Sequence, residues 1–456
     1  MSLQDQAARG GQRIAVIGSG IAGLSAAWLL SRSHDVTLYE AAERLGGHSH
    51  TVDVPTRRGP VAADLGFMVY NERNYPNLVA LLDHLGVQSR PTQMTFSVSL
   101  DDGRLEYAPN NPVSLFAQPK NLVSPRFWRM LADILRFYRH APQHACALDG
   151  RLTTLGEYLG AERYGRAFQD DHLLPQAAAI WSTSMGGIRE YPAEAFIRFC
   201  ENHGLLKVFG RPVWRTVQRG SRAYVLRLLE EMVGKVRLGC GAVQVRRNAD
   251  GAQVRDAGGG IETFDHVVLA CHADEALELL ADPSAQERGL LGAFRYTANH
   301  AVLHTDPKLM PRRRAAWSGW NYVGRRPPDG EGDRDLCVTY WLNRLQGLRT
   351  DKPLFLTLNP LQPPRPETVL HSEVYHHPLF DAPAIRAQKS LWSLQGVRST
   401  WFCGAHFGAG FHEDGLQAGL AVAEALGGVR RPWRVPDESG RIHLGPPPML
   451  RLEQAA

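Results

Sequence analysis

Short apolar runs and helix-like repeats alternate at the start of the chain. Residues 14–17, Ile-Ala-Val-Ile, form a continuous apolar run that predicts a buried strand. After them, Leu24, Ala27 and Trp28 share one face at helical spacing, which predicts a helix. A second strand-like run, Asp-Val-Thr-Leu-Tyr, then ends at Glu40. The start of the chain therefore predicts a β-α-β unit.

The middle of the chain changes its pattern twice. Residues 109–214 are predicted to be mostly helical with proline breaks, and residues 281–394 contain β-branched and aromatic runs typical of strands. The segment 125–140 is an amphipathic helix with three arginines off its apolar stripe, which consists of Phe127, Met130, Leu131, Ile134, Leu135 and Tyr138. Such a helix either packs on its own domain, which is the commoner outcome, or lies on a membrane surface.

A strand, a glycine-rich loop and a helix follow one another again near the end of the chain. Residues 399–403 predict a strand that enters Gly404. After the loop, an amphipathic helix is predicted from the spacing of its apolar face, which consists of Leu416, Leu420, Ala423 and Leu426. The loop therefore lies between two elements and is not a free surface segment.

Length and composition limit the class of protein. A chain of 456 residues predicts two domains or an interleaved pair. The net charge of +5 comes from scattered basic residues, so we expect no nucleic-acid partner. The six cysteines are far apart, which predicts reduced thiols and no metal site. With neither a signal peptide nor an apolar run long enough to span a bilayer, we expect a cytoplasmic protein, with contact to the inner face of the membrane as an option.

The first glycine-rich loop indicates a dinucleotide site. Gly18, Gly20 and Gly23 form a G-x-G-x-x-G motif between the predicted strand and helix, and Glu40 lies 22 positions (40 − 18) after Gly18. Gly18 permits the tight turn, Gly20 lets the backbone approach a pyrophosphate, and Gly23 lets helix and strand pack closely. The helix start then offers N–H groups to the phosphates. Glu40 suits the acid that binds a ribose hydroxyl.

The residues after Glu40 carry a family resemblance. Arg44, Gly46 and Gly47 complete an R-x-G-G sequence. With the glycine motif, this resembles the flavoprotein superfamily of amine oxidases, protoporphyrinogen oxidases and carotenoid desaturases, and most closely a bacterial amine-oxidase-like group. The resemblance implies that FAD is the cofactor and that these residues, together with Ala22, lie along it. His48 stands where the family often has arginine.

The resemblance also assigns the second loop to the flavin. It implies that Gly404 and His406 face the cofactor, that Val243 lies against the adenine, and that the N–H groups of Asp414, Gly415 and Leu416 point at the flavin. Backbone N–H groups at a helix start stabilise the negative charge that a reduced flavin carries. His406 replaces an acidic residue common in the family, and Phe411 replaces a tyrosine. We expect Phe411 and His412 at the catalytic face, where His412 is either an acid/base group or a support of the loop.

These patterns together predict an α/β cofactor domain within a chain that is α+β as a whole. A Rossmann-like FAD-binding domain with a parallel sheet carries an inserted substrate domain of strands and helices. The FAD-binding segments are 1–70, 215–280 and 395–430. The substrate-domain segments are a mostly helical 71–214 and a strand-rich 281–394, and 431–456 is a proline-rich tail.

The expected activity is a flavin-dependent oxidation. No second G-x-G-x-x-G motif is present, which favours electrons that come from the substrate rather than from NAD(P)H. Residues 371–395 contain no cysteine, so the resemblance implies non-covalent FAD. We expect desaturation or oxidation of an apolar, lipid-like substrate, with reoxidation by oxygen or a quinone-like acceptor. The alternatives are an amine or amino-acid oxidase that forms hydrogen peroxide, and a non-catalytic, flavin-bearing lipid-binding protein. The oligomeric state stays open.

Overall fold

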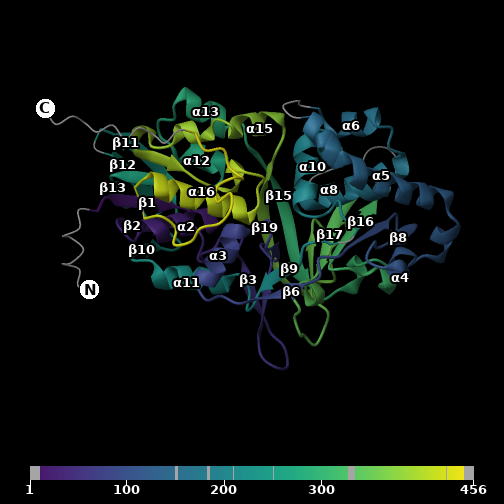
Figure 1. Ribbon diagram of the computed structural model, residues 1–456. Coiled ribbons are helices and arrows are strands. Elements are labelled where there is room, and N and C mark those ends of the chain that lie inside the picture. The colour runs from purple at the N-terminus through teal and green to yellow at the C-terminus, as the bar shows by residue number, and fades with distance from the viewer. Residues whose placement is uncertain are drawn as a thin grey trace.

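A five-stranded parallel sheet forms one half of the molecule (Figure 1). The computed structural model describes residues 11–148, 153–181, 185–208, 210–249, 251–326, 334–427 and 429–445. All neighbouring strands of this sheet run parallel. In sheet order they are β10 (Gly234–Arg237), β2 (Asp35–Tyr39), β1 (Arg13–Ile17), β14 (His266–Leu269) and β20 (Thr400–Phe402). This parallel sheet confirms the predicted Rossmann-like α/β fold. Distant parts of the chain supply its adjacent strands.

Two helices from opposite ends of the chain lie together beside this sheet. Every residue of α2 (Ile21–Leu30) is buried, and α16 (His412–Ala425) packs along it. The contact is close because Gly419 has no side chain: a Cβ there would lie 2.1 Å from the Ala22 carbonyl oxygen. Helices α3 (Pro76–His84) and α11 (Arg222–Glu231) pack against the same pair. The starts of α2 and α16 are therefore held next to each other.

A seven-stranded sheet forms the centre of the second half (Figure 1). Its strands are antiparallel except for the pair of β16 and β7. In sheet order they are β19 (Val369–Leu379), β15 (Arg295–His304), β18 (Phe355–Leu358), β17 (Asp335–Trp341), β16 (Trp320–Arg325), β7 (Phe96–Leu100) and β8 (Leu105–Tyr107). Strands β7 and β8 come from the segment that was expected to be mostly helical.

Smaller sheets and helices complete the two halves. Three small sheets contain β3 (Thr51–Val54) with β4 (Val61–Asp64), β5 (Tyr70–Asn71) and β6 (Ser89–Thr92) with β9 (Trp214–Val217), and β11 (Ala242–Asn248), β12 (Gly251–Asp256) and β13 (Ile261–Phe264). The helical part holds α4 (Pro112–Leu115), α5 (Pro125–Ala147), α6 (Leu155–Ala161), α7 (Arg166–Phe168), α8 (Leu174–Trp181), α9 (Met185–Arg189) and α10 (Ala193–Asn202). The remaining α-helices are α12 (Ala273–Leu279), α13 (Ala285–Leu291), α14 (Leu342–Leu345) and α15 (Ala382–Gln388).

The long helix α5 buries most of the predicted apolar stripe. Phe127, Met130 and Ile134 are buried, and Leu131 and Tyr138 are partly buried against the same core. Phe137 joins this face, whereas Leu135 was expected in the stripe but is 57% exposed, and Trp128 is 50% exposed. The helix packs on α7 and α10, which is the commoner of the two expected outcomes. No helix among the described residues is both long and apolar enough to cross a bilayer.

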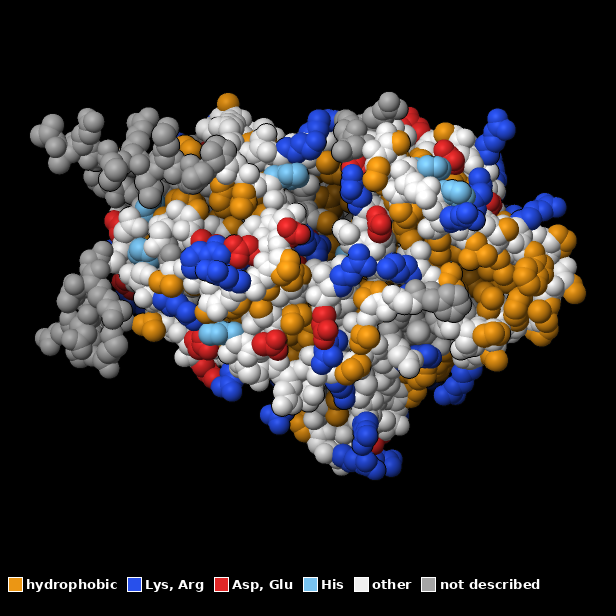
Figure 2. Space-filling model, in the orientation of Figure 1, with side chains coloured by type: hydrophobic (Ala, Val, Ile, Leu, Met, Phe, Trp, Pro, Cys, Tyr) orange, Lys and Arg blue, Asp and Glu red, His pale blue; other side chains and the backbone are white. Residues whose placement is uncertain are grey.

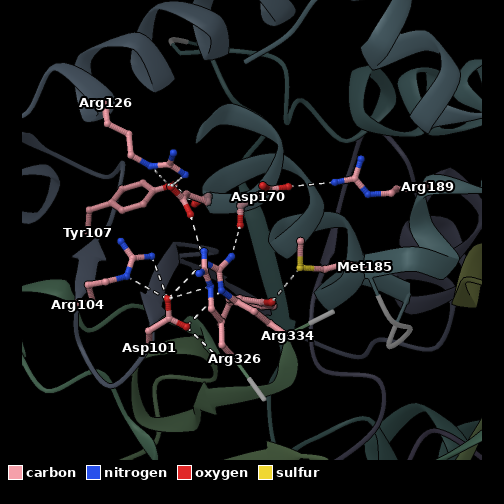
Figure 3. A network of polar contacts seen from close by, with 11 residues as sticks. Asp101, Arg104, Tyr107, Arg126, Asp170, Met185, Arg189, Arg326 and Arg334 are labelled. Carbon is pink, nitrogen blue, oxygen red and sulfur yellow. Dashed lines mark hydrogen bonds and ion pairs between the residues drawn. The ribbon is translucent and has the colours of Figure 1, made fainter. Parts of the chain in front are cut away.

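A network of charged residues joins the helical part to the seven-stranded sheet (Figure 3). Asp170 and Asp171 lie in a π-helical turn over Gln169–Leu173. Arg334, at the start of β17, contacts Asp101 at 3.3 Å, the carbonyl of Asp170 at 3.1 Å and Asp171 at 3.7 Å. Arg126 of α5 also pairs with Asp171, at 2.6 Å. These arginines therefore tie α5 and the turn at Asp170 and Asp171 to the seven-stranded sheet.

Residues 429–445, here named the C-terminal strap, pack back onto the half of the molecule that contains the five-stranded parallel sheet. The strap is the described part of the predicted tail; residues 446–456, like residues 1–10, lie outside the described part of the chain. Trp433 stacks on Trp28 of α2 with ring centroids 5.9 Å apart, and Arg431 pairs with Glu424 of α16 at 2.8 Å. The strap therefore covers α2, α3 and α16 and is part of the fold.

Several core histidines predict acid sensitivity. Burial lowers the pKa of His172 and of His203 to about 3, and that of His304 to about 4, from 6.5. Because the unfolded chain takes up these protons and the folded chain does not, stability is present above pH 6.5 and is lost as the pH falls. Near pH 5.5 each histidine contributes a loss of about 1.4 kcal/mol, so the three together lower the free energy of unfolding by about 4 kcal/mol.

Urea unfolding at about pH 7.5 and at about pH 5.5 measures this loss. Asp64, Glu413 and Asp414 oppose it, because burial raises the pKa of each carboxyl, to about 6 for Asp64, and a proton on the carboxyl stabilises the fold at the lower pH. Burial also lowers the pKa of His48, His406 and His412, which add to the loss, so we expect a clearly lower midpoint at the acidic pH. Equal midpoints would mean that these histidines are solvated in the folded protein.

Candidate cofactor and active site

A cavity of about 1070 Å³ lies where the two glycine-rich loops meet. Its wall combines strand ends of the parallel sheet, the first turns of α2 and α16, and the face of β19. The predicted site residues that line it are Gly18, Gly20, Ala22, Glu40, Arg44, Gly46, Gly47, His48, Val243, Gly404, His406, Phe411, His412 and Gly415. Gly23, Asp414 and Leu416 are outside the lining and have packing contacts instead.

The three glycines of the first loop have the geometry that a phosphate loop needs. Gly18 has a φ of +100°, and a Cβ there would lie 2.9 Å from the Ala270 carbonyl oxygen. At Gly23 a Cβ would lie 1.9 Å from the carbonyl oxygen of Gly18, so this glycine permits the turn itself. A Cβ at Gly20 meets nothing within 4 Å, because it points into the cavity. The open position at Gly20 fits a pyrophosphate that approaches the backbone.

Glu40 holds the first loop in shape. Its carboxylate accepts hydrogen bonds from the Ser19 N–H and the Ala42 N–H, both at 2.9 Å, and from the Ser19 hydroxyl. Arg44 donates to the carbonyl of Gly47 at 2.7 Å, and Gly47 itself has a φ of +55° beside Gly20. The loop of Arg44 therefore packs against the first glycine-rich loop at Gly20.

Val243 marks the other end of the cavity. Its side chain is 48% exposed, and it follows Gly241 and Ala242, which also line the cavity on the side of Glu40. An apolar side chain with one face open suits the flat surface of an adenine ring. The adenine contact nevertheless stays a prediction.

The first turn of the helix at the second loop differs from what the resemblance implied. Helix α16 begins at His412, and the N–H groups of Asp414 and Gly415 donate to the carbonyl of Phe411 at 3.0 and 3.2 Å. Leu416 is fully buried behind them. The prediction that these three N–H groups point at the cofactor is therefore corrected: at a helix start the leading groups, here those of His412 and Glu413, are the ones without an intrahelical partner.

Two buried carboxylates hold this helix start in place. Glu413 accepts hydrogen bonds at 3.0 Å from the N–H groups of Asn77 and Leu78, so it caps the beginning of α3. Asp414 accepts from the N–H of Phe411 at 2.7 Å and pairs with Arg441 of the C-terminal strap at 2.6 Å. The orientation of α16 at the cavity is therefore fixed by contacts to α3 and to the strap.

His412 belongs to a hydrogen-bonded chain at the cavity wall. Its Nε2 lies 2.7 Å from the hydroxyl of Tyr224, which in turn contacts the hydroxyl of Ser49. Its ring stacks on Phe67 with centroids 3.9 Å apart and an angle of 10° between the planes. Burial lowers the pKa of His412 to about 3 and raises that of Tyr224 above its usual range, so both are neutral near pH 7. Phe411, beside it, stacks on Phe199 with centroids 4.9 Å apart.

His406 and His48 each present a nitrogen without a partner. The Nε2 atoms of both rings are buried and make no hydrogen bond within the described part of the chain. Burial lowers the pKa of His406 to about 3 and that of His48 well below its usual value. Because a buried polar atom is normally satisfied, two such atoms at the cavity wall fit a ligand that carries hydrogen-bonding groups. FAD carries such groups along its whole length.

Several residues of the site were missed by the sequence reasoning. Tyr224 of α11 is outside the cavity lining and contacts His412. Tyr375 and His377 line the cavity from one face of β19, where both contact the ring of His48. The alternation of His371, Glu373, Tyr375 and His377 along one strand was a signal that could have found this face. No local pattern marked Tyr224 or Arg441, whose partners are far away in the sequence.

Comparisons with known proteins agree with this geometry. The model of the family described as flavin containing amine oxidoreductase matches residues 21–342, more than half of the chain. Protoporphyrinogen oxidase 2 of Arabidopsis thaliana is 30% identical over 129 residues, which are 27% of this chain and 24% of that relative. The match therefore spans about a quarter of the curated relative.

Two solved structures show the same fold over nearly the whole chain. The CLA-producing fatty acid isomerase from P. acnes has a TM-score of 0.62 and 15% identity, and covers 91% of this chain and 98% of its own. Cyclohexylamine oxidase from Brevibacterium oxydans has a TM-score of 0.60 and 16% identity, and covers 91% of this chain and 99% of its own. The chain belongs to the flavin-containing amine oxidoreductase family and is an FAD-dependent oxidoreductase.

Proposed function

We propose that this oxidoreductase removes a hydride from an apolar, lipid-like substrate, in a desaturation or oxidation at an activated C–H bond. The observation that carries the proposal is the wall of the cavity near Phe411. It is built from apolar and aromatic side chains of both halves, namely Phe67, Met68, Val69, Met94, Phe199, Leu205, Trp214, Trp320, Tyr340, Leu358, Phe380 and Phe411. Such a lining favours an apolar ligand with few polar groups.

The charged residues of the cavity lie away from this apolar wall. Glu40 and Arg44 belong to the predicted cofactor loops, and Glu275 and Glu278 lie on α12 next to the strand ends of the parallel sheet. The remaining carboxylate, Glu373, lies beside His50. No lysine is among the described lining residues, and Lys120 and Lys207 are exposed on the surface. Because the apolar wall itself contains no charged side chain to pair with a cation, it favours a neutral substrate over an ammonium ion.

Bound FAD would supply the hydride acceptor, and oxygen or a quinone-like molecule would restore it. The apolar wall excludes water from the substrate and orients it. The first turn of α16 places N–H groups and partial positive charge at the cavity wall, which favours negative charge there. The chain His412–Tyr224–Ser49 can hold a proton and pass it along neutral groups.

The cofactor is proposed to be held without a covalent bond. Cys271 is the one cysteine among the described lining residues. Burial raises the pKa of its thiol well above the usual value, which makes it a poor nucleophile near pH 7. Release of all flavin by acid precipitation would agree with this assignment.

Anaerobic mixing tests the substrate class. The FAD-bound protein is mixed with a total lipid extract and, separately, with a panel of amines and amino acids, and the loss of flavin absorbance is followed. We expect reduction by lipids alone. The variant His412→Ala is expected to keep its FAD and to be reduced roughly a hundredfold more slowly, the range for loss of a proton-transfer group.

Each other outcome points to a different activity. Reduction by amines but not by lipids would overturn the proposal in favour of an amine or amino-acid oxidase that forms hydrogen peroxide. Lipid binding without reduction by either class would favour the non-catalytic, flavin-bearing lipid-binding protein.

We further propose that the outer face of α5 contacts a membrane surface, from which a lipid-like substrate could be taken. Hydrophobic side chains gather at the α4–α5 end of the molecule in Figure 2. The exposed ones are Val113 (75%), Leu122 (51%), Val123 (81%), Trp128 (50%) and Leu135 (57%). The exposed arginines Arg129 and Arg139 of the same helix suit anionic headgroups.

A vesicle experiment checks this surface. Sedimentation with vesicles of phosphatidylglycerol and phosphatidylcholine is expected to weaken roughly tenfold in the variant Trp128→Ser/Leu135→Ser, because two apolar side chains no longer enter the interface. The matched control is Leu226→Ser/Ile261→Ser, which removes two exposed apolar residues from the FAD-binding half. Equal binding of both variants would argue against α5 as the contact.

A further inference from the structure

Two histidines and a carboxylate meet where the FAD-binding half contacts the seven-stranded sheet. His50 lies between the predicted cofactor loop and β3, whereas His371 and Glu373 are two residues apart on one face of β19. We propose that His50, His371 and Glu373 form a binding site for a divalent transition-metal cation such as Zn²⁺, which links the two halves. Binding of the cation at this site does not depend on which substrate the enzyme oxidises.

The distances in this cluster suit a metal. One possible ligand atom from each residue lies within 4.8 Å of the other two. The Glu373 carboxylate is 3.7 Å from His50 Nδ1 and 3.6 Å from His371 Nε2. Zinc binds such atoms at about 2.0–2.2 Å, which places tetrahedral ligands about 3.3 Å apart. Shifts of less than about 1 Å would therefore complete the site.

The surroundings leave His371 available for a cation. Its Nε2 is buried and makes no hydrogen bond within the described chain. The rings of His50 and His371 stand at 88° to each other with centroids 5.3 Å apart, so they do not stack and both can turn toward a common point. The hydroxyl of Tyr375 lies 2.7 Å from His50 Nδ1, so a cation bound at this nitrogen would replace that hydrogen bond. Imidazole and carboxylate ligands are the usual set for zinc outside cysteine-rich sites.

The site has an entry path and an open position. The side chains of His371 and Glu373 are 34% and 37% exposed, whereas that of His50 is 7% exposed. Three protein ligands leave a fourth position for water. Since Glu373 and Tyr375 also line the large cavity, a bound cation would fix this part of its wall. The cation is expected to act as a cross-link between the His50 loop and β19.

Calorimetric titration with Zn²⁺ tests the site. The FAD-bound protein is treated with EDTA, freed of it, and titrated with Zn²⁺; we expect one cation per chain, with a micromolar or tighter Kd, and a higher melting temperature. The variants His371→Ala and Glu373→Gln are each expected to weaken binding at least tenfold and to abolish the thermal shift. Both residues are half-exposed, and the flavin content of each variant reports that it has folded.

The matched control is His300→Ala. His300 is exposed on the neighbouring strand β15 and contacts Ser372, next to the cluster but outside it. This variant is expected to bind Zn²⁺ like the unchanged protein. Undetectable binding by the unchanged protein, or equal binding by all three variants, would overturn the proposal.

Discussion

The variant Gly20→Val is expected to be folded and colourless. Gly20 has an extended backbone with φ −61° and ψ 175°, which valine adopts without strain, and its Cβ would meet nothing within 4 Å. The added side chain therefore occupies only the space that a pyrophosphate would need. We expect FAD affinity to fall at least about a hundredfold, or about 2.7 kcal/mol. Flavin content after purification and the Kd from flavin fluorescence measure the effect.

Two further glycine variants separate this effect from damage to the fold. Gly23→Ala puts its Cβ 1.9 Å from the carbonyl oxygen of Gly18, so we expect it to lower stability as well as FAD content. Gly289 lies in α13, where a Cβ also has open space. The variant Gly289→Val is therefore expected to change neither stability nor FAD content. If Gly20→Val retained FAD at full stoichiometry, the first loop would not be the phosphate site.

The variant Arg441→Leu is expected to lose about 3–5 kcal/mol of stability, the range for breaking a buried ion pair from one side. Arg441 contacts Asp414 at 2.6 Å, and Asp414 is fully buried at the start of α16. Burial already raises the pKa of the Asp414 carboxyl, and without the arginine its charged form has no partner cation. Because this helix start lines the cavity, flavin content should fall too. Urea unfolding and flavin release on heating measure both effects.

The matched control is Arg430→Leu in the same strap. Arg430 pairs with Glu424 and Glu438 but is 57% exposed, so its loss is expected to cost less than about 1 kcal/mol. In the double variant Arg441→Leu/Asp414→Asn the buried charge is gone, and we expect much of the stability to return. A double variant as unstable as Arg441→Leu alone would show that Arg441 acts through packing or through its bond to the Asn74 carbonyl.

The local parts of the site could be predicted from the sequence. Gly18, Gly20, Gly23 and Glu40 lie within one β-α-β unit, where spacing along the chain determines position in space. The structure brings Gly18, Gly20 and Glu40 to one cavity, and Gly23 packs against Gly18 outside its lining. The family comparison agrees with the cofactor that their pattern indicated.

Contacts between distant segments could not be predicted in this way. Tyr224 meets His412 across 188 positions, and only the packing of α11 beside α2 brings them together. The contacts of Glu413 with Asn77 and of Asp414 with Arg441, which fix the start of α16, are likewise not marked by any local pattern. Leu135 of α5 is exposed although it falls in the predicted stripe, because the buried face of this helix depends on its packing against α7 and α10.

The C-terminal strap has a consequence for biosynthesis. A chain growing on the ribosome presents Gly20 early, but strand β20 and helix α16 appear some four hundred residues later, and Arg441 later still. Until Arg441 has emerged, Asp414 lacks the cation that steadies the helix start. Cofactor loading should therefore follow synthesis of the chain through Arg441, and ribosome-bound chains ending before residue 441 should retain little flavin.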